Sequence, residues 1–356
     1  MIVMNDKIDQ TNGETLPTEL DSVASSRKRD HIELAFNSQV ASRQLDDRFY
    51  YEPLLSAHPN PKHWESFAFV RKAMRVPIWV SSMTGGTELA YTINHNLARA
   101  CREFGMGMGL GSCRALLYSN ERLADFDLRP TIGEDLPLYA NLGVAQVEQL
   151  LERDELWRAQ ELVDKLRADG LIIHVNPFQE WLQPEGDHFN RPPIEIIRTF
   201  LAQSNIPVIV KEVGQGMGRE SLRALLQLPL EAVDFAASGG TNFALLELLR
   251  SDPQHQHNYE KLAYIGHGNE DMVNLTNELL VELGEDRKCG QIIISGGVKD
   301  FLDGYYLMNR LNLSSVYGQA SGFLKHARGD YADLRAYVAA QVKGLALAKA
   351  FLRIRK

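Results

Sequence analysis

The chain has 356 residues, of which 44% are hydrophobic and 24% are charged, and its formal net charge is −8. This composition excludes a disordered or fibrous chain, and the acidic balance argues against a broad electrostatic surface for nucleic acid. Three cysteines stand far apart, with neither the spacing of zinc ligands nor the density of a disulfide scaffold, so we expect a reducing, cytoplasmic setting: Cys101, Cys113 and Cys289.

The first 24 residues predict a flexible N-terminal tail, because residues 1–24 are rich in Asn, Asp, Glu and Thr and lack apolar periodicity. Neither this stretch nor any later one contains an apolar run as long as a signal peptide or a membrane span. We therefore expect no membrane anchor, and we expect one domain over residues 25–356.

A basic cluster opens this domain. Ser25 and Ser26 could cap a short helix, and its first turn would then carry Arg27, Lys28 and Arg29, with His31 on the face of Arg27. Cations at a helix start oppose the helix dipole, so they need another reason to be there. The cluster suits either a solvated surface or a diphosphate held by charge-assisted hydrogen bonds.

Short apolar runs and helical patterns then alternate along the chain. The strand candidates are 76–83, 106–111, 137–143, 171–176, 207–214, 232–240, 291–297 and 314–322. The helical candidates are 89–104, 145–152, 156–168, 193–204, 219–227, 241–250, 271–284, 300–311 and 331–353. This alternation predicts an α/β fold, a (β/α)8 TIM barrel, over the competing doubly wound open sheet. Segment 251–270 fits neither pattern and is interpreted as an insertion after strand six.

The fourth strand candidate ends in polar residues. His174 and Asn176 lie on one face by the two-residue period of a strand, and Pro177 then stops the ladder. Gln179 and Glu180 follow in the expected loop. An isolated His and Asn would more simply be buried groups that bond to loop backbone, but four polar groups within seven residues favour a site.

The fifth strand candidate would bring Lys211 into the mouth of the barrel. A lysine there costs desolvation unless an anion or an electron-rich ring meets it. A pair with the side chain of Glu212 is disfavoured, because adjacent strand residues point to opposite faces.

Glycine-rich turns follow several strands, at 84–86, 239–241, 296–297 and 318–320. Each alone is weak evidence, because glycines commonly serve turns that bind nothing. Turns after the seventh and eighth strands are where barrels frequently bind phosphate, so together they predict a phosphorylated cofactor.

In their order along the chain, these motifs resemble the FMN-dependent type 2 isopentenyl diphosphate isomerases over residues 26–326. The resemblance rests on RKRDHI (27–32), SSMTGG (81–86), GMGLGSCR (107–114), ANLG (140–143), HVNPFQE (174–180), QPEGD (183–187), KEVGQGMG (211–218), SGGTN (238–242), ISGGVKD (294–300) and GQASGFLKHA (318–327).

The resemblance implies a role for each matching residue. The substrate diphosphate would be held by Arg27, Lys28, His31, Ser112 and Arg114. FMN would be lined by Met83, Thr84, Gly85, Ser112, Asn141, Lys211, Thr241, Gly296, Gly297, Ala320 and Ser321. Gln179 resembles the residue that handles the proton at the substrate, with His174 and Asn176 beside it, and Glu180 resembles the Mg²⁺ ligand.

The implied reaction interconverts isopentenyl and dimethylallyl diphosphate, with reduced FMN as acid and base, Mg²⁺ on the diphosphate, and NADPH or NADH as the reductant of the flavin. Gln179 has no useful pKa, so we expect it to relay and orient hydrogen bonds. The chain departs from the family pattern at Cys113, at Lys299 and over 264–271. The family forms homo-oligomers, and residues 331–353 could supply an interface or serve as an ordinary barrel helix.

Two other functions stay open. One is an FMN barrel of the 2-hydroxy acid oxidase type, although residues 295–300 lack the His and Arg pair that such chemistry uses. The other is a flavin-binding barrel without turnover, against which the intact HVNPFQE run argues.

Overall fold

The computed structural model describes residues 18–60, 64–82, 84 and 87–355 of the chain. It divides into two compact units, residues 1–49 and 50–356, and each is described by itself. Most of the predicted tail, residues 1–17, lies outside the described residues, and the division of the chain at residue 25 stays a prediction.

The first unit contains helix α1 (Thr18–Leu34) and a short 3-10 helix, η1 (Ser42–Gln44). The predicted cap at Ser25 and Ser26 is wrong, because both residues lie inside α1 and the helix begins earlier, at Thr18. Residues 18–24, which precede the two serines, include Glu, Leu and Ala, and these are good helix formers. Extending a helix is also easier than nucleating one. The basic cluster therefore lies in the second half of a longer helix.

The second unit is built on a closed barrel of eight parallel strands, with neighbours in the order β10-β11-β4-β5-β6-β7-β8-β9. Seven of the eight strands lie within the predicted apolar runs and β7 begins one residue before its run, so the predicted barrel is confirmed. The strands are β4 (Ile78–Val80), β5 (Gly107–Gly109), β6 (Leu138–Gly143), β7 (Gly170–His174), β8 (Val208–Lys211), β9 (Ala232–Asp234), β10 (Gln291–Ile294) and β11 (Ser314–Gln319).

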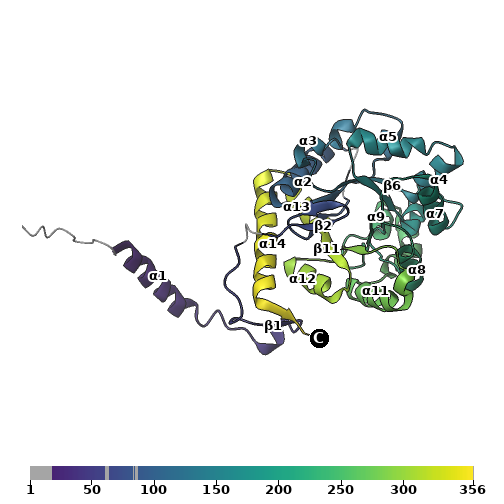
Figure 1. Ribbon diagram of the computed structural model, residues 1–356. Coiled ribbons are helices and arrows are strands. Elements are labelled where there is room, and N and C mark those ends of the chain that lie inside the picture. The colour runs from purple at the N-terminus through teal and green to yellow at the C-terminus, as the bar shows by residue number, and fades with distance from the viewer. Residues whose placement is uncertain (1–17, 61–63, 83, 85–86, 356) are drawn as a thin grey trace, which may run out of the picture. The chain divides into compact units, whose positions relative to one another are not determined.

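Helices surround the barrel, and Figure 1 shows them outside the strands. They are α2 (Ala90–Phe104), α3 (Arg129–Ile132), α4 (Val144–Glu152), α5 (Trp157–Leu166), α6 (Pro177–Leu182), α7 (Pro193–Gln203), α8 (Arg219–Leu226), α9 (Phe243–Arg250), α11 (Asn269–Leu283), α12 (Phe301–Arg310), α13 (Ser321–Ala327) and α14 (Tyr331–Phe351). Every predicted helical stretch is confirmed. The long last helix, α14, packs against α2, α12 and α13 of its own chain, as a barrel helix does.

Segment 251–270 follows the sixth barrel strand, as expected, but it is not irregular. It forms helix α10 (Pro253–Tyr259) and the 3-10 helix η4 (Glu260–Tyr264). The carboxylate of Asp252 accepts the main-chain N–H groups of Gln254 and His255, and Pro253 occupies the first turn. Asp followed by Pro is a helix start signal that outweighs the poor apolar periodicity of this segment.

A hairpin closes the amino end of the barrel. Strands β2 (Phe67–Phe69) and β3 (Lys72–Met74) are antiparallel and are joined by Val70 and Arg71, which have φ angles of 41° and 67°. Phe69 and Val70 are fully buried in a cluster with barrel residues that include Trp79, Ile172 and Ile293. The barrel is therefore sealed by apolar packing at the end where its strands begin.

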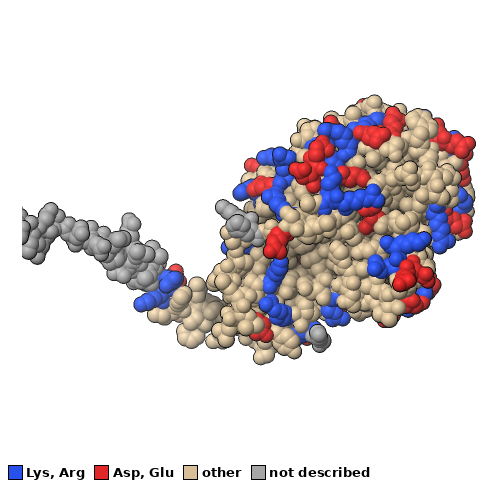
Figure 2. All heavy atoms as spheres, in the orientation of Figure 1, with Lys and Arg blue, Asp and Glu red and all other residues tan. Residues whose placement is uncertain are grey.

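One face of the second unit is seen in Figure 2 with its charged side chains coloured. Basic and acidic side chains are intermixed on this face, without a single basic patch.

A second small sheet pairs β1 (Phe49–Tyr51) with β12 (Leu352–Ile354). The three cysteines are free and buried. Among the described helices, none combines the length and the apolar character that crossing a bilayer requires.

Candidate active site

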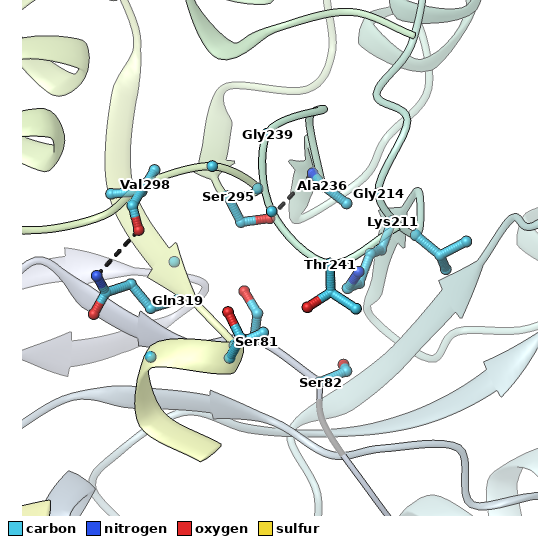
Figure 3. A pocket seen from close by; sticks show the side chains of 18 of the residues that line it. Ser81, Ser82, Lys211, Gly214, Ala236, Gly239, Thr241, Ser295, Val298 and Gln319 are labelled. Carbon is cyan, nitrogen blue, oxygen red and sulfur yellow. Dashed lines mark hydrogen bonds between the residues drawn. The ribbon is translucent and has the colours of Figure 1, made fainter. Parts of the chain in front are cut away.

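A cavity of about 300 Å³ opens at the carboxyl ends of the barrel strands. Figure 3 shows Lys211, Thr241, Ser295, Ser81 and Ser82 around it. Six residues of the predicted FMN set line it: Lys211, Thr241, Gly296, Gly297, Ala320 and Ser321. The loops after β8, β9, β10 and β11 therefore converge on one space, as the barrel fold requires of a site.

Two glycine loops pack main chain against main chain at this cavity. Gly296 and Gly297 have φ angles of 83° and 69°, in the left-handed region that favours glycine. An added Cβ at Gly296 would overlap the main chain of Ala237, and one at Gly240 would lie 2.9 Å from the nitrogen of Gly297. Within the described residues, no acceptor is found for the main-chain N–H of Gly297. The loops thus form a cradle that exposes main-chain donors.

Three ionisable residues lie in one row across the strand ends. The register pairs His174 of β7 with Lys211 of β8, and Lys211 with Asp234 of β9. Lys211 is buried, and its Nζ donates to the main-chain oxygen of Glu212 at 2.6 Å. Asp234 is fully buried and accepts a hydrogen bond from Ser295, and burial raises the pKa of its carboxyl. Lys211 therefore supplies a positive charge at the floor of the cavity.

Glu212 faces away from this row, as the alternation of a strand predicts. Its Oε2 accepts the main-chain N–H groups of Gly214 and Gln215, each at 2.6 Å, and that of Gly216 at 3.0 Å. Burial raises the pKa of Glu212, which lines a separate cleft between α7 and α8. The carboxylate thus shapes the turn that follows Lys211, and Gly214 of this turn lines the main cavity.

The proton of His174 can be assigned from its neighbours. Asn141 donates from Nδ2 to the main-chain oxygen of Leu110 at 2.9 Å, which fixes the orientation of its amide. Its Oδ1 then faces Nδ1 of His174 at 2.7 Å, so Nδ1 must donate. Burial, together with the charge of Lys211, lowers the pKa of His174 to about 4. At neutral pH the ring is uncharged, and its Nε2 is an acceptor.

Asn176, Gln179 and Glu180 form a second hydrogen-bonded group. The expected loop is wrong, because Pro177 begins the short helix α6 and Asn176 is its N-cap residue. Proline at the first helical position has a suitable φ and needs no N–H partner there. Nδ2 of Asn176 donates to Oε1 of Gln179 at 3.0 Å and to Oε1 of Glu180 at 2.9 Å. Oδ1 of Asn176 is buried and has no partner among the described residues.

A third group surrounds Arg114, which is exposed on η2 (Arg114–Leu117) next to exposed Ser112. Its Nη1 donates to Oδ2 of Asp187 at 2.5 Å. The main-chain N–H of Asp187 donates in turn to Oε2 of Glu180 at 2.8 Å. Arg114 and Glu180, which were predicted for different ligands, are therefore linked through one residue.

Arg27, Lys28 and His31 are exposed on α1 in the first unit, and their roles stay predictions. Thr84 is partly buried, and its main-chain oxygen accepts from Asn94 at 3.3 Å. Two members of the predicted FMN set, Met83 and Gly85, lie outside the described residues.

Sequence reasoning missed several residues of the site. Ser295 lines the cavity, and it precedes the two glycines for which its motif was noticed. Asp234 interrupts an apolar strand, and a charged residue at such a position was a usable signal. Lys299, noted in the sequence only as a departure from the family pattern, also lines the cavity, and Cys113 is buried with its Sγ 3.3 Å from the oxygen of Gly111.

The described residues contain no cluster of three or more His, Cys, Asp or Glu side chains that could hold a metal ion by itself. Glu180 accepts one hydrogen bond on each oxygen, which leaves lone pairs on both. A cation at Glu180 would need further oxygen ligands from a bound molecule.

Comparison with curated proteins finds relatives of similar length. The chain is 34% identical over 304 residues to a protein of Rickettsia felis named isopentenyl-diphosphate delta-isomerase, and the match covers 85% of each chain. A protein of the same name from Rickettsia akari is 33% identical over 307 residues, which are 85% of this chain and 86% of that protein. No protein-family model matches.

Comparison with solved structures finds the same fold at low identity. A mandelate oxidase variant with an FMN adduct has a TM-score of 0.52 at 12% identity, covering 86% of this chain and 88% of that one. The recombinant flavin-binding domain of baker's yeast flavocytochrome b2 has a TM-score of 0.57 at 11% identity, covering 85% of this chain and 72% of that one.

Proposed function

Because this chain belongs to the isopentenyl-diphosphate delta-isomerase family, we propose that it interconverts isopentenyl and dimethylallyl diphosphate by the FMN-dependent, type 2 route. The observation that carries the proposal is the cavity at the strand ends, with its glycine cradle and its buried lysine. The mandelate oxidase variant with an FMN adduct and the flavin-binding domain of flavocytochrome b2 share the barrel and support this choice of cofactor.

The residues around the cavity fit FMN. The main-chain donors of Gly296 and Gly297, with the start of α13 at Ser321, would hold the phosphate group, because such donors and a nearby cation favour an anion. Lys299 would supply the cation. Lys211 would meet the electron-rich ring system, which explains why a buried lysine is tolerated there.

The two diphosphates are isomers, so the reaction moves a proton and a double bond without net oxidation. Bound reduced FMN would supply the acid and the base, with NADPH or NADH as the reductant. Neutral His174 presents an acceptor at Nε2 and cannot act as a charged acid at pH 7. Gln179 uses Oε1 to accept from Asn176, which leaves its amide N–H groups free to orient a neighbouring group.

Glu180 fits the proposed Mg²⁺ site as one carboxylate among oxygen ligands. Mg²⁺ is commonly bound by one or two carboxylates, with the remaining positions taken by substrate phosphate and water. The substrate diphosphate would supply the missing oxygens. Ser112 would donate a hydrogen bond to it, and Arg114 and the basic cluster of α1 would neutralise its charge.

We propose that the protein works as a homo-oligomer, and that neither rival function applies. For a 2-hydroxy acid oxidase, residues 295–300 would have to supply a His and Arg pair, whereas they bring Ser295 and Lys299 to the cavity. A barrel without turnover has no chemical need for Gln179 and Glu180 to share one asparagine.

The test is a spectrum followed by an assay. The purified protein should show the visible absorbance of a bound flavin, and it should isomerise isopentenyl diphosphate only after anaerobic reduction of that flavin in the presence of Mg²⁺. Oxidation of 2-hydroxy acids by oxygen would favour the oxidase. Flavin with neither activity would favour the silent barrel, and the absence of flavin would overturn the proposal.

A further inference from the structure

Asp187 lies in the segment between α6 and α7, and it makes contacts with three separate parts of the chain. Its Oδ2 accepts from Nη1 of Arg114 at 2.5 Å and from Nε2 of Gln146 at 2.8 Å. Its Oδ1 accepts from Nε2 of Gln149 at 3.3 Å. Its main-chain N–H donates to Glu180 at 2.8 Å. Only 18% of its side chain is exposed, so water contributes little to its solvation.

Helix α4 holds Asp187 in place independently of Arg114. Gln146 and Gln149 lie one turn apart on α4, and Oε1 of Gln146 also accepts the main-chain N–H of Gly143 at 3.1 Å. The buried carboxylate of Glu148, on the same helix, accepts the main-chain N–H groups of Asn190 and Arg191 at 2.8 and 3.0 Å. Helix α4 therefore fixes both Asp187 and the residues that follow it.

Arg114 depends on Asp187 for its position. Its side chain is 58% exposed, and Asp187 is its one hydrogen-bond partner among the described residues. A guanidinium has five N–H groups, so the others stay available to a second anion. Without a partner, a long exposed arginine samples many rotamers, and a ligand would have to order it.

We propose that Asp187 is a positioning residue for the anion of the substrate. Its carboxylate holds Arg114 in the orientation that binds a diphosphate, and its N–H holds the carboxylate of Glu180 beside it. The proposal rests on the proposed function, because that function supplies the anion. Asp187 also carries a negative charge, so the opposite outcome, in which it competes with the ligand for Arg114, is a real alternative that the experiment decides.

The experiment measures the affinity of the FMN-loaded protein for inorganic diphosphate with Mg²⁺, by titration calorimetry, and KM and kcat for isopentenyl diphosphate. We expect Asp187→Ala to weaken diphosphate binding and to raise KM by about tenfold, on the order of one charge-assisted contact, with kcat nearly unchanged. Asp187→Asn should recover most of the affinity, because its amide oxygen still accepts from Arg114. The flavin spectrum and Tm report whether each variant is folded.

Two further variants make the assignment specific. Glu185→Ala removes the ion pair of the same segment with Arg250, which measures 2.8 Å and is exposed on both sides, and it should leave the affinity unchanged. Arg114→Ala should lower the affinity, and adding Asp187→Ala to it should lower the affinity no further, because the two residues act as a unit.

The outcomes separate the two proposals. If the wild-type protein binds neither inorganic diphosphate nor isopentenyl diphosphate, the proposed function fails and this inference fails with it. If the wild-type protein binds both, but Asp187→Ala binds equally well or more tightly, the proposed function stands and the positioning role of Asp187 is wrong. The positioning role is also wrong if Asp187→Ala lowers the affinity for diphosphate equally in the wild-type protein and in the Arg114→Ala variant.

Discussion

At the amino end of the barrel, Phe69 and Val70 fill the space between the strands, and polar groups of the hairpin find partners at two points. The main-chain N–H of Val70 donates to Gln291 at 2.8 Å, and Lys72 pairs with Asp169 at 3.1 Å. The carboxyl end is hollow, and polar atoms of Ser81, Asn176, Asp234 and Asn269 are buried there without a partner among the described residues.

This contrast shows how one barrel serves two purposes. Buried polar atoms without partners cost stability, and they are tolerated where a ligand completes their hydrogen bonds. Apolar packing at the other end offsets that cost and binds nothing. A substitution at the amino end should therefore change stability and leave the chemistry intact, whereas one at the carboxyl end should also change the chemistry.

The largest expected effect is on stability, at the amino end. Phe69→Ala should lower the free energy of unfolding by about 3–5 kcal/mol, because it removes a fully buried ring from the hairpin cluster. Phe67→Ala is the matched control, since Phe67 is only partly buried on the same hairpin and should cost less. Denaturant unfolding measures both. If the folded fraction of Phe69→Ala had a lower kcat than the wild type, the amino end would affect turnover as well as stability, and the contrast between the two ends would be wrong.

The second prediction concerns His174, at the carboxyl end, and the dependence of the free energy of unfolding on pH. The pKa of folded His174 is about 4, below its ordinary value of about 6.5. Its contribution to stability is thus complete above about pH 6.5 and is lost as the pH falls towards 4, to an extent of about 3 kcal/mol. We expect His174→Gln to lose less stability than the wild type between pH 7 and pH 4.

Urea unfolding across that pH range measures the difference, and His188→Gln serves as the control, because His188 is exposed. Parallel pH profiles for the wild type and His174→Gln would mean that His174 is solvated and free to protonate.

The third prediction concerns the chemical step. Gln179→Ala should keep FMN and its reduction by NADPH, but it should lose kcat by about 10²-fold or more, on the scale of a positioned proton-transfer group. Gln160→Ala, an exposed glutamine on α5, should keep normal turnover. Steady-state kinetics with reduced flavin measure kcat for both variants. Near-normal kcat for Gln179→Ala would make this residue a bystander.

The smallest expected effect tests the first unit. Lys28→Ala should mainly raise KM, by about tenfold to over a hundredfold, because one charge-assisted contact with an anion contributes roughly 1.5–3 kcal/mol. Kinetics at low ionic strength measure it, with Arg43→Ala, on the neighbouring helix η1, as the control. An unchanged KM would assign the basic cluster to a solvated surface.

Local patterns predicted the barrel well, because strand and helix periods repeat along the chain and some strands end in polar groups, as β7 does at His174 and β8 at Lys211. The hairpin was missed. Its strands have three residues each, and the turn places Val70 and Arg71 at positive φ where Asn and Gly are usual.

Single-strand patterns predicted the site where its residues end a strand, as His174 and Lys211 do, and the glycine turns predicted loops that line the cavity. Asp187 could not be assigned a role, because its partners at 114, 146 and 180 come together only in the folded chain. Gln179 was wrongly expected in a loop for a different reason: Pro177 ends the strand pattern, but it also begins helix α6.

The hairpin at the amino end has a consequence for the order of folding. Val70 bonds to Gln291, which lies 221 residues further along the chain, and Arg71 pairs with Glu231 at 2.5 Å. Contacts over such separations carry a large loop-closure entropy and are slow to form. The seal over the barrel interior therefore cannot be made until β10 has joined the sheet. During synthesis, the apolar layer around Phe69 stays open to water until most of the chain has left the ribosome, and this is the period when aggregation threatens the protein most.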